Sequence, residues 1–97
     1  MSLQHPDFSN MTPSDAIAFA IDKAGGQTAL ANQINEYMDT HPLLKVDRKP
    51  TNQKDVGRWL HRDQKASATY SAIISEITGI PTFVLRPDVF TRPLKTA

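Results

Sequence analysis

The hydrophobic positions of this chain recur mostly at intervals of three and four residues, which is the period of an α-helix. The first such stretch is preceded by Thr12 and ends before two glycines, so we expect a helix from there to about Ala24. Pro13 suits the first helical position, and a capping box joins Thr12 to Asp15. A second helix is expected after Gly26, to about residue 39.

The third expected helix, from about residue 52 to 62, carries two different sides. Thr51 or Asn52 is placed to cap it. At 100° per residue, Val56, Trp59 and Leu60 fall on one side. The opposite side gathers basic and small residues, namely Lys54, Gly57, Arg58 and His61. We expect the first side to pack against the protein and the second to present charge to a partner.

The remaining segments complete an all-α pattern of four to five helices. A fourth helix is expected from its cap Ser67 to Gly79, and one short helical turn from Thr82. No stretch longer than a few residues has the alternation of a strand. Residues 1–10 are predicted to form a flexible N-terminal arm, residues 11–90 the folded domain and residues 91–97 a C-terminal tail.

Size and composition are those of one small globular domain. The chain has 97 residues, of which 39% are hydrophobic and 22% charged. The absence of cysteine excludes disulfides, thiolate zinc sites and a cysteine nucleophile. The longest apolar run is far too short to cross a membrane, and the first ten residues lack the layout of a signal peptide. We therefore expect a cytoplasmic protein with no membrane partner.

Charge is distributed unevenly along the chain. Residues 1–44 carry one lysine against five acids, whereas residues 45–65 carry seven Lys and Arg against three Asp. A basic block in an otherwise acidic protein is typical of a surface that binds a polyanion such as nucleic acid. A merely solvated surface is the alternative explanation.

Gly57 is unexpected inside a helix, where glycine costs about 1 kcal/mol relative to alanine. It either lets a DNA strand approach the backbone closely or allows tight packing within the protein. The amides beside it can pair with adenine, and the cations can reach guanine or phosphate. The DNA contacts expected from this helix are Thr51, Asn52, Gln53, Lys54, Gly57, Arg58, His61 and Arg62, with Lys65 as a phosphate contact.

Four short motifs give the chain a family resemblance. The segments AIDKAGGQTALANQI, VGRWL, AIISEITG and LRPDVF resemble the YdaS-type, Cro/cI-like branch of prophage helix-turn-helix regulators, from roughly Ala16 to Phe90. The resemblance implies a lambda-repressor-like bundle whose third helix enters the major groove. It also implies a transcriptional regulator, most typically a repressor, that binds a double-stranded DNA operator as a homodimer. Some members of this group are antitoxins.

The resemblance also implies roles for individual positions. Gln27 opens the second helix, where such proteins place a glutamine that grips phosphate and braces the recognition helix, and Thr28 lies beside it. Ala31 takes the small-residue position that lets the two helices pack closely. Arg86 and Asp88 are expected to tie the C-terminal segment to the bundle.

One departure from the family pattern is an insertion of about fifteen residues, at about 35–50, before the recognition helix. It implies a longer second helix followed by a loop, and it leaves the angle between the two helices open. The insertion brings three cations close to the recognition helix, which we expect to extend the phosphate contact: Lys45, Arg48 and Lys49. Alternatively, its apolar residues form a dimer contact.

No pattern in the sequence favours an enzyme. The three histidines are scattered, the serines lack a nucleophile motif, and AGGQT has neither the spacing nor the lysine of a phosphate-binding loop. We therefore expect no catalytic residue, no metal and no cofactor. The competing function is that of an antitoxin that acts mainly by binding a toxin encoded nearby.

Overall fold

The computed structural model describes residues 11–45 and 49–90 and, within those ranges, contains helices and no strand. The predicted all-α fold is therefore confirmed, with five α-helices joined by one 3-10 turn and one π-helical turn. The predicted arm (1–10) and tail (91–97) lie outside the described residues. The elements in chain order are α1 (Pro13–Ala24), α2 (Gln27–Thr40), η1 (Pro42–Lys45), α3 (Gln53–Arg58), η2 (Trp59–Asp63), α4 (Ser71–Thr78) and α5 (Thr82–Leu85).

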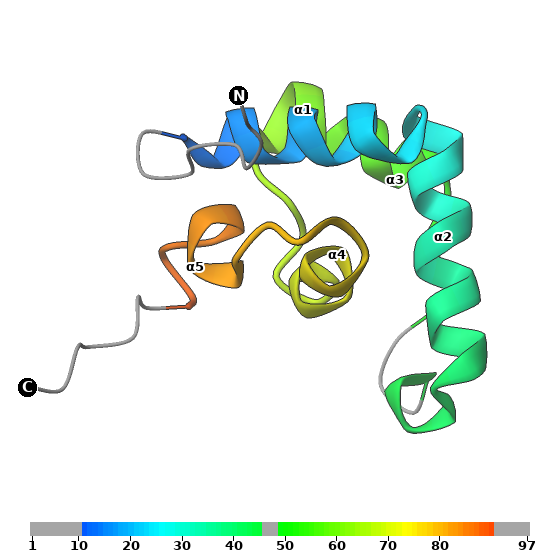
Figure 1. Cartoon of the computed structure of the whole chain (residues 1–97). Coiled ribbons are helices and arrows are strands. Elements are labelled where there is room, and N and C mark those ends of the chain that lie inside the picture. The colour runs from blue at the N-terminus through cyan, green and yellow to red at the C-terminus, as the bar shows by residue number, and fades with distance from the viewer. Residues whose placement is uncertain (1–10, 46–48, 91–97) are drawn as a thin grey trace, which may run out of the picture.

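The helices surround one hydrophobic core. In Figure 1, α1 lies along one side of the bundle, with α3 and η2 behind α1. α2 follows the C-terminal end of α1 and runs away from it at a steep angle. α4 and α5 close the opposite side, and α1 contacts both of them. The largest fully buried side chains in the described residues are Ile17, Leu30, Ile34, Met38, Ile73, Ile74, Ile80, Leu85 and Val56.

The start and end of α1 follow the predicted signals. The Thr12 hydroxyl accepts a hydrogen bond from the Asp15 N–H at 3.0 Å, and the Asp15 carboxylate accepts one from the Thr12 N–H at 3.2 Å. These bonds complete the capping box. At the other end, Gly25 has φ of 104°, a left-handed conformation that a glycine adopts without strain.

The fourth helix begins later than predicted. The expectation that Ser67 caps it is wrong, because α4 starts at Ser71. Residues 68–70 form a turn instead: the Ser67 hydroxyl accepts from the Thr69 N–H, and the Ser71 hydroxyl donates to the Ser67 carbonyl. This turn brings the ring of Tyr70 to 5.7 Å from that of Trp59.

The sequence pattern predicted one continuous α-helix from about residue 52 to 62. The structure differs, because the α-helix ends at Arg58. After Arg58 the chain continues as the π-helical turn η2, and Gln64 follows in the left-handed conformation with φ of 57°. The Lys65 N–H then donates to the Trp59 carbonyl at 3.0 Å, which closes the helix end.

Candidate nucleic-acid interface

The two sides of α3 and η2 are separated as predicted. Val56 and Trp59 are buried, with 0% and 3% of their surface exposed. The residues of the opposite side that lie exposed are Asn52, Gln53, Lys54, Arg58, His61 and Arg62. Asn52 also caps α3, because its side-chain oxygen accepts from the Asp55 N–H at 3.0 Å.

The start of α2 is joined to the start of α3 through two glutamines. The side-chain N–H of Gln53 donates to the side-chain oxygen of Gln27. Gly57 lies one turn further along α3, and a Cβ at that position would be 3.0 Å from the Gln27 oxygen and 3.6 Å from the Gln53 nitrogen. Of the two explanations for Gly57, this geometry favours tight packing within the protein, because the missing side chain leaves room for the amide pair.

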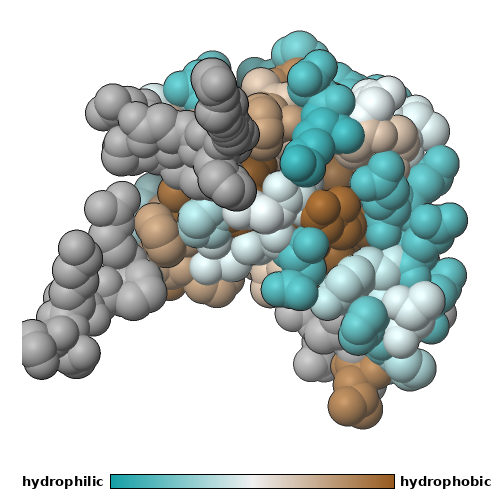
Figure 2. Space-filling model, viewed as in Figure 1, coloured by the Kyte–Doolittle hydropathy of each residue, from teal (hydrophilic) through white to brown (hydrophobic). Residues whose placement is uncertain are grey.

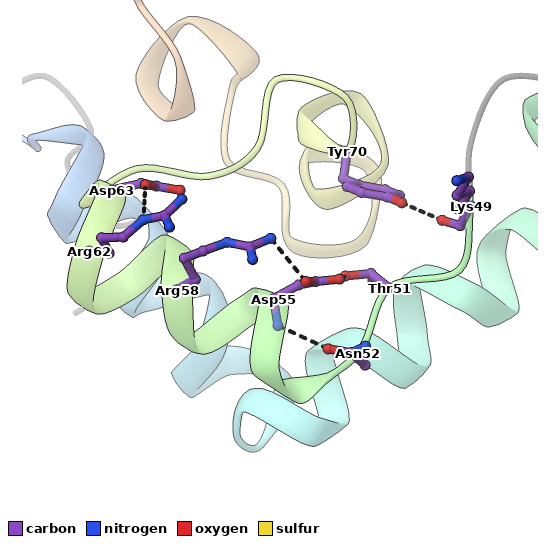
Figure 3. A network of polar contacts seen from close by, with 8 residues as sticks. All are labelled: Lys49, Thr51, Asn52, Asp55, Arg58, Arg62, Asp63 and Tyr70. Carbon is purple, nitrogen blue, oxygen red and sulfur yellow. Dashed lines mark hydrogen bonds and ion pairs between the residues drawn. The ribbon is translucent and has the colours of Figure 1, made fainter.

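Asp55 is held by two partners on its own segment (Figure 3). Its carboxylate accepts from Arg58 at 2.9 Å and from the Thr51 hydroxyl at 3.1 Å. Thr51 is buried, so the prediction of a DNA contact through its side chain is wrong. Its hydroxyl instead supports the carboxylate that pairs with Arg58.

Part of the positive charge is neutralised locally. Arg62 pairs with Asp63 at 3.0 Å, in addition to the pair between Arg58 and Asp55 (Figure 3). An arginine has five N–H donors, and each of these pairs uses only one of them. Over the described residues 49–65, five Lys and Arg stand against two Asp, so the segment keeps a net charge of +3.

The insertion does not detach α3 from α2. The side-chain amide of Asn35, on α2, donates to the Thr51 carbonyl at 2.8 Å and accepts from the Thr51 N–H at 2.9 Å. The Tyr70 hydroxyl donates to the Lys49 carbonyl, so the end of the insertion is held from a second side (Figure 3). The angle between the two helices, which the insertion left open, is therefore fixed by these contacts and by the packing of α2 on α3.

The other predicted contacts are distributed around this helix pair. Gln27 is half-buried and Thr28 exposed at the start of α2, and Lys49 is exposed before α3. Ala31 is buried, as its small-residue position implied. The side chain of Lys45, at the end of η1, and all of Arg48 lie outside the described residues.

The C-terminal segment is tied to the loop after η2, as predicted for Arg86 and Asp88. Arg86 donates to both carboxylate oxygens of Asp88, at 2.9 and 2.7 Å, and to the Ala66 carbonyl at 3.1 Å. Its hydrogen bonds lower the pKa of the Asp88 carboxyl from 3.8 to about 2. The hydrogen bonding with Asp88 also raises the pKa of Arg86. Lys65 lies near this pair, with its Nζ 4.0 Å from Asp88.

Three residues that organise the site were not predicted from the sequence: Asn35, Gln64 and Tyr70. An asparagine in a helix interior is disfavoured, because its amide competes for backbone groups, and this was the available signal for Asn35. Gln64 carried no such signal, since the left-handed position usually falls to glycine or asparagine. Tyr70 lies within the helix that the sequence predicted from Ser67 to Gly79, and the helical pattern did not indicate that its hydroxyl reaches Lys49.

The described residues contain no group of three or more His, Asp or Glu side chains that could hold a metal ion. Within the same ranges, no helix combines the length and hydrophobicity needed to cross a membrane. Comparison with models of known protein families, with curated proteins and with solved structures finds no match to this chain.

Proposed function

We propose that this chain is a sequence-specific, double-stranded DNA-binding regulator of transcription, with α3 and η2 as its recognition helix in the major groove. The observation that carries the proposal is the exposed, net-positive side of this helix, braced from the start of α2 by the pair of Gln27 and Gln53. Helix-turn-helix proteins place the start of their second helix and the exposed side of the next one against the same stretch of DNA.

The chemistry available on this surface suits both base reading and phosphate binding. Gln53 gives one N–H to Gln27 and retains its other N–H and its oxygen, the pair of groups that recognises adenine. Lys54 has an exposed ammonium group, and Arg58 retains four N–H donors beyond its bond to Asp55, for guanine or phosphate. Gln27 and Thr28 lie at the start of α2, where a phosphate is electrostatically favoured.

The remaining features of the proposal follow from this mode of binding. One recognition helix reads only a few base pairs, so we propose that a homodimer binds a palindromic operator. We also propose that the protein acts as a repressor and does so in the cytoplasm. Kinship with YdaS-type, Cro/cI-like prophage regulators is part of the same proposal. It involves no catalysis and no cofactor.

A gel-shift titration tests the proposal. Labelled DNA from upstream of the protein's own gene is compared with an unrelated duplex of equal length, at two salt concentrations. The proposal expects tighter binding to the upstream DNA and a steep loss of affinity at the higher salt, because neutralised phosphates release counterions. Equal, salt-independent affinity for both duplexes would contradict it.

A second candidate function is supported by the far end of α2. Leu43 is 87% exposed there, beside an open, mainly apolar cavity of about 450 Å³ lined by Tyr37, Thr40, His41 and Pro42. The rings of Tyr37 and His41 stack with centroids 4.1 Å apart. Figure 2 shows hydrophobic surface projecting at this end of the molecule. Such a surface suits a protein partner, as an antitoxin would require.

The two candidates are separated by matched variants. Leu43→Asn should weaken binding to the product of a neighbouring gene and leave DNA affinity unchanged if the protein-binding function holds. Gln53→Ala should have the opposite pattern if DNA binding is the main function. Copurification and gel-shift titration measure the two effects.

A further inference from the structure

We propose that the cleft between η2 and the loop that follows it is a binding site for one phosphate group. The cleft has a volume of about 280 Å³ and is open to solvent. Its charged lining consists of Arg58, Arg62, Lys65, Arg86 and a single acid, Asp63. Since a water molecule takes up about 30 Å³, the volume holds a phosphate group together with bridging waters.

The hydrogen-bond donors around the cleft are only partly used. Arg58 gives one N–H to Asp55, and Arg62 gives its Nε–H to Asp63. Lys65 stands 4.0 Å from Asp88, which is too long for a hydrogen bond, so its ammonium group retains its donors. These three cations can therefore donate to one anion from two sides of the cleft.

Arg86 plays a different part, because its bonds to Asp88 and to the Ala66 carbonyl use three of its five N–H donors, whereas Arg58 and Arg62 each use one. It holds the loop in place and adds positive charge to the wall of the cleft. The lining has four cations and one carboxylate, and two further carboxylates, Asp55 and Asp88, pair with Arg58 and Arg86 from outside the lining. The cleft therefore keeps a net charge of +1. Guanidinium groups match the oxygens of a phosphate through paired N–H donors, which favours phosphate over a halide ion.

The phosphate group can come from two sources. It is either a backbone phosphate of DNA bound along α3 and η2, in which case the site rests on the proposed function, or it belongs to a free phosphorylated molecule. The binding of a free phosphate does not depend on DNA binding. The cleft can therefore be tested on the protein alone.

Trp59 provides the first readout, because it is the chain's only tryptophan and lines the cleft. The full chain is titrated with inorganic phosphate at constant ionic strength, against chloride, while the fluorescence of Trp59 and the NMR amide shifts of residues 65–68 are recorded. A saturable response to phosphate is expected. Arg62→Gln should weaken it about tenfold, and Asp63→Asn should strengthen it. The control Lys23→Gln, which removes an exposed charge from α1, should leave it unchanged.

The second readout is the salt dependence of DNA binding by the same variants. If the cleft holds a DNA phosphate, Arg62→Gln lowers the slope of log affinity against log salt by about 0.9 relative to Lys23→Gln. Between 50 and 200 mM salt, this amounts to a roughly three- to fourfold smaller loss of affinity. The effect should be equal for upstream and unrelated DNA, since phosphate contacts carry no sequence information.

Each outcome of the two readouts has a defined meaning. Phosphate binding with an unchanged slope assigns the site to a free phosphorylated molecule, and a changed slope assigns it to DNA. No saturable phosphate response together with an unchanged slope overturns the site, even if specific DNA binding is found. If the protein binds no DNA at all, the proposed function fails, and the phosphate titration still decides whether the cleft is a site.

Discussion

The side chain of Asn35 binds the backbone of Thr51 in both directions, donating to its carbonyl and accepting from its N–H. The amide of one helix thereby acts as a backbone partner for the residue that precedes the cap of the next helix. In a compact helix-turn-helix unit the short turn itself limits where the second helix can lie. Here a long connection separates α2 from α3, and the pair between Asn35 and Thr51 fixes the start of α3.

Asn35→Ala should destabilise the protein by about 1–3 kcal/mol, because it leaves two polar groups of the buried Thr51 without their partner. Urea unfolding measures the effect. Asn32→Ala is the control, since Asn32 lies exposed on the same helix and should change stability by less than about 0.5 kcal/mol. Equal effects of the two substitutions would show that the hydrogen bonds between Asn35 and Thr51 contribute nothing to stability.

Gly57→Ala should have an effect that depends on Gln27. Alanine favours a helix by about 1 kcal/mol, but the added Cβ would lie 3.0 Å from the Gln27 oxygen and displace it. The full gain in the free energy of unfolding is therefore expected only when Gln27 is also replaced by alanine. The effect of the double substitution should differ from the sum of the two single effects by at least about 0.5 kcal/mol in unfolding experiments. Additive effects would mean that Gly57 does not make room for the amide pair.

Gln64→Gly should stabilise the protein by about 0.5–1 kcal/mol. The left-handed conformation costs a residue with a side chain about 1–2 kcal/mol, and the greater freedom of glycine in the unfolded chain cancels part of the gain. Gln64→Ala is the matched control, because it shortens the side chain but leaves the strain of the left-handed backbone conformation in place. Thermal unfolding would contradict this account if both variants melted at the same temperature.

Asp88 should make stability depend on pH in the acid range. Its hydrogen bonds from Arg86 lower the pKa of its carboxyl from 3.8 to about 2 in the folded protein. The unfolded chain therefore takes up the proton first, so the stabilisation is complete above about pH 4 and is lost as the pH falls towards 2. The stability difference between wild type and Asp88→Asn should shrink over this range in urea unfolding. A difference independent of pH would exclude this role of the pair.

Helix positions and buried sides were predictable from local signals in the sequence. The capping box at Thr12, the glycine at 79 and the spacing of Val56 and Trp59 each act within one helix, so that a linear pattern is sufficient to identify them. The pairing of Asp55 with Arg58 was equally local, at a separation of three residues.

Contacts between distant segments could not be predicted from such local patterns. Asn35 and Thr51 are sixteen positions apart, Tyr70 and Lys49 twenty-one, and Gln53 and Gln27 twenty-six. Each depends on how the helices are oriented, which hydrophobic spacing alone does not specify. For the same reason the role of Gly57 had two explanations until the position of Gln27 was known.

A gel-shift titration of wild type, Gln53→Ala and Arg58→Ala against DNA from upstream of the gene tests whether α3 is the recognition helix. We predict that each substitution weakens binding by about 1–3 kcal/mol while the free energy of unfolding stays nearly unchanged, because both side chains are exposed. Trp59→Ala, by contrast, should destabilise the fold by about 3–5 kcal/mol. Wild-type DNA affinity in both the Gln53 and the Arg58 variant would contradict the assignment of α3 as the recognition helix.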